Sequence, residues 1–184
     1  MEKIYSFVFR GLLTEEALDR NGRKNPKKFS SHLEEEVAQR LSLNLIDEEY
    51  IAAAREMSTV FTAITAFENS VRELVSKRLL EEKKENWWEE SVSEKIRKKA
   101  ESRRDEESKT RWHTPRGETL IHYTDFGDLV SIIQNNWLLF EDYFPSVEWA
   151  RQILMTLEYS RNVIMHSGQL GRVDIERIVL QRIF

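Results

Sequence analysis

Residues 146–168 read SVEWARQILMTLEYSRNVIMHSG, a pattern typical of one amphipathic helix. Pro145 cannot continue a preceding helix, and Ser146 is a good N-cap residue. Apolar residues then recur at three- and four-residue steps, as they do on the buried face of a helix. Gly168 follows the last periodic residues, where glycine commonly ends a helix. We therefore predict one helix that stops at Ser167-Gly168.

Three polar residues gather near the C-terminal end of this predicted helix: Arg161, Asn162 and His166. Asn162 and His166 are four residues apart and share a face. Arg161 lies about 140° around the helix from His166, but its long side chain can reach across a turn. Basic residues in a last turn also suit the helix dipole and can bond the free carbonyls. Residue chemistry alone leaves a capping role and a functional site both open.

The composition predicts an all-α protein. Charged residues make up 33% of the 184 residues, while glycine and proline number only six and three, which disfavours a sheet protein. Cysteine is absent, which excludes disulfides, zinc–thiolate sites and cysteine nucleophiles and fits a reducing compartment. The four histidines are scattered, so we expect no metal and no cofactor. No signal peptide or apolar run of about 20 residues is visible, so we expect a cytoplasmic protein without membrane contact.

The remaining pattern predicts further helices. Residues 1–45 are expected to be a helical extension and 46–184 the main domain, because a capping-box pattern opens a helix at Ser31 and a second start follows at Asp47. The helix from Asp47 to Glu85 carries an apolar stripe of Met57, Phe61, Ile64, Val71, Val75 and Leu79. Within it, Glu68 and Arg72 are spaced for an ion pair. That pair is either a surface bridge of little energetic value or a core-facing group.

The segment 95–116 is strongly basic on a chain of net charge −4. It holds nine basic and four acidic residues, a local charge of +5. We predict a solvated helix or a mobile arm here, because few positions are apolar. Its candidates for contact with an RNA backbone are Lys95, Lys98, Lys99, Arg103 and Arg104. An ordinary solvated helix face explains the same charges. A last helix is expected over Val173–Phe184, and its abrupt end suggests that the natural protein continues.

The segment from Arg161 to His166 resembles the Arg-polar-x-x-x-His motif of the HEPN superfamily (higher eukaryotes and prokaryotes nucleotide-binding domains). Further landmarks look like one HEPN branch, found in RNA quality-control endonucleases and bacterial defence proteins. They are Phe67–Leu74, Trp87-Trp88, Tyr123–Leu129, Asn136-Trp137 and Phe140. The resemblance runs from about Glu48 to the C-terminus.

The resemblance implies an antiparallel helical bundle that forms a homodimer and cleaves RNA without a metal. It implies Arg161, Asn162 and His166 as the catalytic set, with Glu68 and Arg72 as secondary candidates. A histidine can take the proton of a 2′-hydroxyl near neutral pH, and an arginine can hold phosphoryl oxygens. RNA control or phage defence is the implied role. A non-catalytic dimerisation or scaffold module, or a nucleotide sensor, is the alternative.

Overall fold

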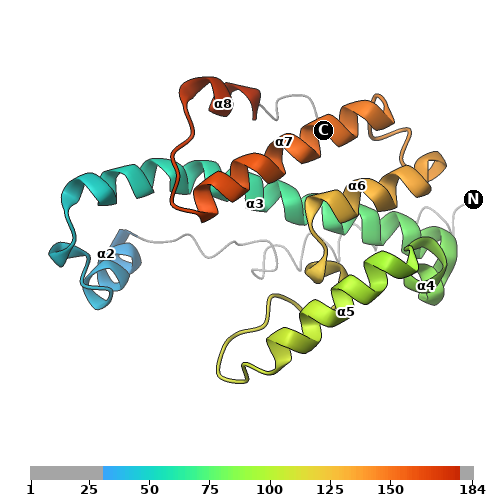
Figure 1. Ribbon diagram of the computed structural model, residues 1–184, viewed down its shortest axis with the longest axis horizontal. Helices are drawn as coiled ribbons and strands as arrows, with labels where there is room; N and C mark the ends of the chain where they lie inside the picture. The colour runs from blue at the N-terminus through green and yellow to red at the C-terminus, as the bar shows by residue number, and fades with distance from the viewer. Residues whose placement is uncertain (1–30, 179–184) are drawn as a thin grey trace, which may run out of the picture. The chain divides into compact units, whose positions relative to one another are not determined.

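The computed structural model describes residues 31–178, and these residues form helices and turns without a β-strand (Figure 1). The prediction of an all-α fold is confirmed. The α-helices are α2 (Ser31–Arg40), α3 (Glu48–Lys83), α4 (Trp87–Ser91), α5 (Glu94–Ser108), α6 (Phe126–Asn135), α7 (Val147–Met165) and α8 (Arg172–Arg177). Short 3-10 helices lie at η1 (Leu43–Leu45), η2 (Lys84–Asn86), η3 (Leu120–Tyr123) and η4 (Trp137–Leu139). Most of the predicted N-terminal extension and the end of the predicted last helix lie outside the described residues.

The chain divides into two compact units, Met1–Ile51 and Ala52–Phe184. The described part of the first unit holds α2, η1 and the start of α3. The start of α3 follows from its sequence, because Asp47 Oδ1 accepts a hydrogen bond from the backbone N–H of Glu49 at 3.1 Å. The division into a helical extension over residues 1–45 and a main domain over 46–184 stays a prediction.

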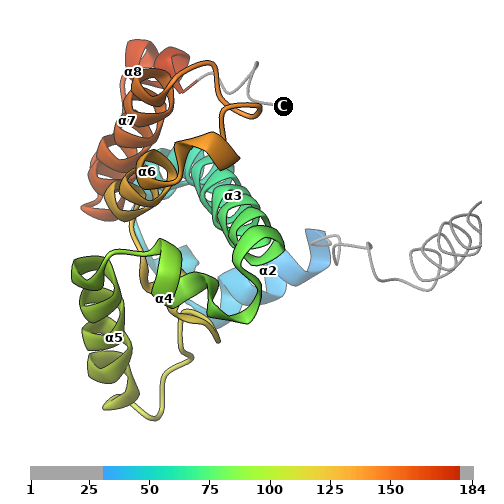
Figure 2. The ribbon, with the colours of Figure 1, turned by 90° about the vertical axis from the view of Figure 1, so that its right-hand side faces the viewer.

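In the second unit, α3 buries the stripe that its sequence predicts. Five of the six predicted positions are buried, and Phe61 is half-buried. Phe67 is also buried. Each buried aliphatic or aromatic side chain contributes about 1.5–3 kcal/mol relative to an exposed one, so this stripe anchors the core. α7 runs back along α3 in the opposite direction, as Figures 1 and 2 show.

The apolar faces of α6 and α7 complete the core. Asp125 caps α6, because its Oδ1 accepts from the backbone N–H of Asp128 at 2.9 Å. Ser146 caps α7 in the same way, accepting from the N–H of Trp149 at 3.1 Å. The fully buried side chains from these two helices are Phe126, Leu129, Ile132, Ile133, Leu154 and Leu157. The start of α7 agrees with the N-cap that the sequence predicts.

The charged helix α5 is docked rather than a free arm. Ile96 and Ala100 are buried in the core, and the rest of the helix is largely exposed. Trp88 is buried in the core, with the ring of Trp87 edge-on to it at a centroid distance of 5.4 Å. Figures 1 and 2 both place α5 and α7 on different sides of α3. The two tryptophans thus lie on the short helix α4, which joins α3 to α5 in the chain.

Candidate functional site

The C-terminal end of α7 is shaped by a hydrogen-bonded cap. The N–H of Gly168 donates to Val163 O at 2.8 Å, and the N–H of Ser167 donates to Ile164 O at 2.9 Å. This pair of bonds is a Schellman motif, and Ser167 takes its left-handed position with φ 60°. Gly168 is needed for a different reason, since a Cβ there would lie 2.7 Å from Val163 Cγ1. The turn therefore leaves His166 as the C-cap residue of α7.

Arg161 projects from α7 into a charged cluster. Its Nη1 donates to Glu68 Oε1 at 2.8 Å, and its guanidinium lies over the ring of Phe126 at 5.3 Å. The side chain is 23% exposed, so it is neither buried nor free in solvent. Among the described residues, no hydrogen bond involves its Nε or Nη2. Arg161 is thus held through its Nη1 atom, while its other donors stay available to an anion.

Glu68 and Arg72 form the predicted i,i+4 ion pair, and it faces the interior. The distance from Arg72 Nη2 to Glu68 Oε1 is 2.6 Å, with side chains 14% and 6% exposed. Arg72 also donates to the backbone oxygen of Thr124 at 2.9 Å. Burial lowers the pKa of Arg72, and the positive charge of Arg161 adds to that lowering against the opposing effect of Glu68. One buried carboxylate therefore neutralises two arginines only in part.

The side chains of His166 and Asn162 make none of the hydrogen bonds of this cluster. Both residues are exposed, and no hydrogen bond to another described residue involves either side chain. Their positions four residues apart place them on one face of α7. Arg161 instead bonds Glu68 of α3. The structure therefore brings Arg161, Glu68 and Arg72 together and leaves the imidazole accessible at the helix end.

A pocket of about 380 Å³ opens beside the charged cluster. It is lined by Thr65, Glu68, Asn69, Arg72, Arg103, Arg116, His122, Thr124, Asp125 and Arg161. Four guanidinium groups and two carboxylates line it, and Asp128 and Glu107, outside this lining, pair with Arg103 and Arg116. Guanidinium donors that these pairs leave unused favour an anionic ligand.

Sequence reasoning missed Arg116 and His122 as site residues. Arg116 was counted only in the basic stripe, and His122 only among scattered histidines. Gly117 was the available signal for His122, and no local signal marks Arg116. A Cβ at Gly117 would lie 2.3 Å from His122 Cγ, so a glycine is required for the ring to pack there.

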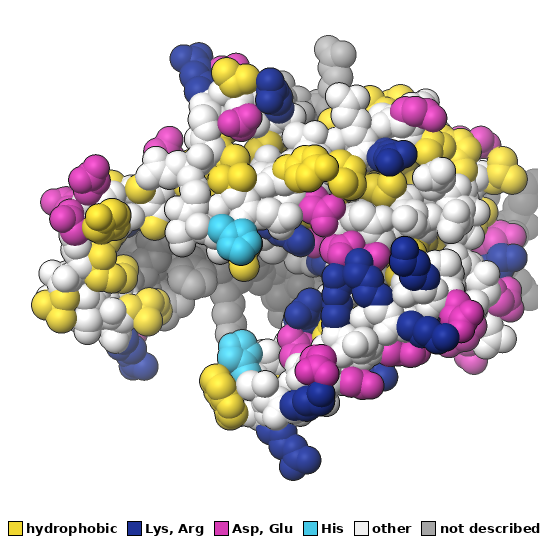
Figure 3. Space-filling model, in the orientation of Figure 1, with side chains coloured by type: hydrophobic (Ala, Val, Ile, Leu, Met, Phe, Trp, Pro, Cys, Tyr) yellow, Lys and Arg dark blue, Asp and Glu magenta, His cyan; other side chains and the backbone are white. Residues whose placement is uncertain are grey.

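Two of the five basic candidates on α5 serve the fold. Lys99 Nζ bonds Asp125 and Asp128 at 2.8 and 2.9 Å, and Arg103 pairs with the same two carboxylates. Figure 3 shows Lys and Arg side chains gathered over α5 with acidic side chains among them. Part of the basic stripe is therefore neutralised by the N-terminal turn of α6.

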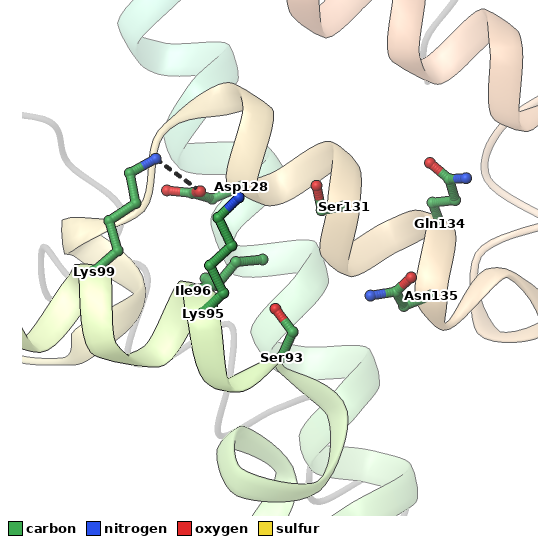
Figure 4. A pocket seen from close by; sticks show the side chains of 8 residues that line it. All are labelled: Ser93, Lys95, Ile96, Lys99, Asp128, Ser131, Gln134 and Asn135. Carbon is green, nitrogen blue, oxygen red and sulfur yellow. Dashed lines mark hydrogen bonds and ion pairs between the residues drawn. The ribbon is translucent and has the colours of Figure 1, made fainter.

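The other three basic candidates remain on the surface. Lys98 pairs with Glu94, and Arg104 lies 3.9 Å from Asp105. Lys95 is exposed beside a groove of about 380 Å³ between α5 and α6, which Lys99 and Asp128 also line (Figure 4). No ion pair to a described residue involves Lys95. The charge of this helix thus remains partly open to a polyanion.

No described helix is long and apolar enough to cross a membrane. A family model described as Swt1-like HEPN matches residues 62–182, about two thirds of the chain. No curated protein and no solved structure matches the chain. The matched region includes Glu68, Arg72 and the whole of α7.

Proposed function

The chain belongs to the Swt1-like HEPN family, and on this premise we propose that it is a metal-independent endoribonuclease. The proposed site uses Arg161, Asn162 and His166 at a homodimer interface. The observation that carries the proposal is the state of Arg161, which is half-buried, bonded to Glu68 and still has free donors. RNA control or phage defence in the cytoplasm is the proposed setting.

The residues suit cleavage through the 2′-hydroxyl of RNA. His166 would take the 2′-hydroxyl proton, and the 2′-oxygen would attack the adjacent phosphorus. Arg161 would bind the phosphoryl oxygens, whose negative charge grows in the transition state. The 5′-oxygen then leaves and takes up a proton, which gives a 2′,3′-cyclic phosphate end. Asn162 shares the face of His166 and would orient the imidazole or bond the same phosphate.

The positions of the two key side chains support a composite site. At about 100° per residue, Arg161 and His166 leave α7 about 140° apart. A second protomer could supply the missing group to a phosphate bound at either one. Three large side chains near the end of α7 are exposed and could contribute to such an interface: Tyr159 (65%), Val163 (40%) and Met165 (63%).

One observation favours a non-catalytic alternative. Arg161 links α7 to Glu68 of α3 and to Phe126 of α6, so its contacts also serve the packing of the bundle. A scaffold or dimerisation module would need no more than this. The two functions differ in what His166 does, because the described contacts give its side chain no packing role.

The test is cleavage of a mixed RNA pool in EDTA by the full chain and by Arg161→Ala and His166→Ala. Loss of the base typically slows such a reaction by about 10²–10⁴-fold. Arg40→Ala is the matched control, because the ion pair that Arg40 makes among the described residues is with exposed Glu36 on α2. We expect cyclic phosphate ends from the parent and the control alone. Equal activity of the parent and both site variants, all folded and dimeric, would leave the scaffold function as the better conclusion.

A further inference from the structure

The segment between α5 and η3 carries chemistry that the proposed catalytic set does not use. Residues 109–119 include Arg111, Trp112, His113 and Arg116. Trp112 is 86% exposed, the most exposed of the large hydrophobic side chains among the described residues. Its ring meets that of His113 edge-on at 5.6 Å, and His113 is exposed as well. An exposed indole between arginines needs an explanation, since leaving so much apolar area in water stabilises nothing.

This loop is held on its C-terminal side. The Glu107 carboxylate accepts from the backbone N–H of Arg116 at 3.0 Å and from its Nε at 3.2 Å. At the next residue, the hydroxyl of Tyr123 donates to Gly117 O at 3.3 Å. The bonds to Arg116 lower the pKa of Glu107, which keeps the carboxylate ionised. The loop tip with Trp112 is therefore presented from a fixed base.

The anchoring leaves the two Nη atoms of Arg116 without a hydrogen bond to a described residue. Its Nε and backbone N–H donate to Glu107, and its guanidinium lies over the Tyr123 ring at 5.4 Å. Arg116, Arg161 and Arg72 line the same pocket. The Nη2 atom of Arg161 donates no hydrogen bond to a described residue, and the buried Nε of Arg72 has no acceptor among them. Arg103 is committed to Asp125 and Asp128. The available donors in the pocket therefore come from the loop and from α7.

His122 adds a polar group to the pocket wall. Its Nδ1 lies 3.4 Å from the backbone N–H of Thr119 and 2.9 Å from the Thr119 hydroxyl. Nδ1 also lies 3.2 Å from the Thr119 carbonyl oxygen, so it has both donor and acceptor groups of Thr119 around it. The pocket thus combines guanidinium donors with an imidazole ring, a set suited to phosphate oxygens.

We propose that the 109–119 loop binds single-stranded RNA, with one phosphate held by Arg116 and Arg161 and a base of the same strand stacked on Trp112. A planar guanidinium matches two phosphate oxygens, and an exposed indole accepts any base by stacking. The unused guanidinium donors of the pocket favour a nucleic acid over a neutral or basic protein partner. The identity of the ligand as RNA rests on the proposed function, but the binding itself does not require His166.

The test measures the affinity of the full chain carrying His166→Ala for a fluorescein-labelled single-stranded RNA, by anisotropy. In this background we expect Trp112→Ala to weaken binding roughly 5- to 100-fold, the range of one lost stacking contact. Trp112→Phe keeps an aromatic face and should restore most of the affinity. Tyr50→Ala is the control, because it removes a comparably exposed aromatic side chain (72%) elsewhere.

Salt dependence tests the phosphate contact separately. Arg116→Ala should reduce the slope of log affinity against log salt by about 0.7, one lost contact on a single strand. Arg40→Ala should leave the slope unchanged. Arg116→Lys keeps the charge but loses the planar fork, so it should preserve the slope while weakening binding.

Three results would overturn the loop proposal. The first is unchanged RNA affinity in both Trp112→Ala and Arg116→Ala when Arg161→Ala weakens binding. The second is equal affinity for a nucleoside 5′-monophosphate and for the strand, which would indicate a mononucleotide site. The third is an effect of Trp112→Ala on self-association alone, which would indicate a protein contact. The cleavage assay is independent of all three, so failure of the loop proposal and failure of the proposed activity can be distinguished.

Discussion

Replacing Glu68 with glutamine perturbs the charge cluster that joins α3 to α7. Glu68 Oε1 accepts from Arg72 at 2.6 Å and from Arg161 at 2.8 Å, and its side chain is 6% exposed. Glutamine keeps the shape and one acceptor oxygen but removes the negative charge. Both guanidinium groups then remain close together without that counter-ion. We expect the folded state to lose stability for this reason.

The magnitude follows from the burial of the three groups. Removing one partner of a buried ion pair costs about 3–5 kcal/mol, because the remaining charge stays desolvated. Arg72 is 14% exposed and Arg161 is 23% exposed, so water solvates part of each. The lower end of the range therefore applies, and we expect Glu68→Gln to lower the free energy of unfolding by about 3 kcal/mol.

Urea unfolding followed by far-ultraviolet circular dichroism measures this change through the midpoint and slope of the transition. Glu94→Gln is the matched control, because the Lys98–Glu94 pair has the same 2.6 Å distance but side chains 72% and 69% exposed. That control should change the free energy of unfolding by less than about 0.5 kcal/mol. Equal changes in the two variants would refute the reasoning that burial of the cluster sets its energetic importance.

Three further changes test other parts of the structure. Burial alone would raise the pKa of Asp125, but bonds from the α5 cations hold it well below its ordinary value. The stabilisation from this residue is therefore present above about pH 4 and is lost as the pH falls further. Asp125→Asn should lower the free energy of unfolding by about 1–2 kcal/mol at pH 7. The same change should make the urea midpoint depend less on pH between pH 7 and pH 3. Gly168→Ala places a Cβ 2.7 Å from Val163 Cγ1 and 2.9 Å from its backbone oxygen, so it should cost about 1–3 kcal/mol by thermal unfolding. Gly171→Ala, with its nearest contact at 3.6 Å, is the control and should change stability by less than about 0.5 kcal/mol. Ser146→Ala removes the N-cap of α7 and should cost about 1 kcal/mol in the same assay, and no change in melting temperature would contradict that role.

Local sequence signals predicted the helices well because each signal, a cap or an apolar stripe, depends on residues that are close in the sequence. Asp125 and Ser146 cap α6 and α7 through bonds that span only three residues. The stripe on α3 is buried because its three- and four-residue steps repeat on one helix face. The prediction for α5 was less complete. This helix has few apolar residues, but two of them, Ile96 and Ala100, are buried and dock it on the core.

The candidate site was predicted only in part because its contacts join distant segments. The i,i+4 spacing of Glu68 and Arg72 predicted their pair, but not that the pair would be buried. Arg161 reaches Glu68 across 93 residues of sequence. Nothing local in the sequence indicates such a contact, and the same holds for Arg116 entering the pocket.

The sequence by itself therefore determined the all-α class, the helix starts and the family resemblance, since capping, periodicity and motif spacing are properties of short segments. Only the tertiary structure decided which charges are neutralised and which remain available. It commits Lys99 and Arg103 to the carboxylates of α6, and it leaves donors free on Arg161 and Arg116. The physical reason is that the strength and availability of a charged group depend on burial and on partners brought together by packing.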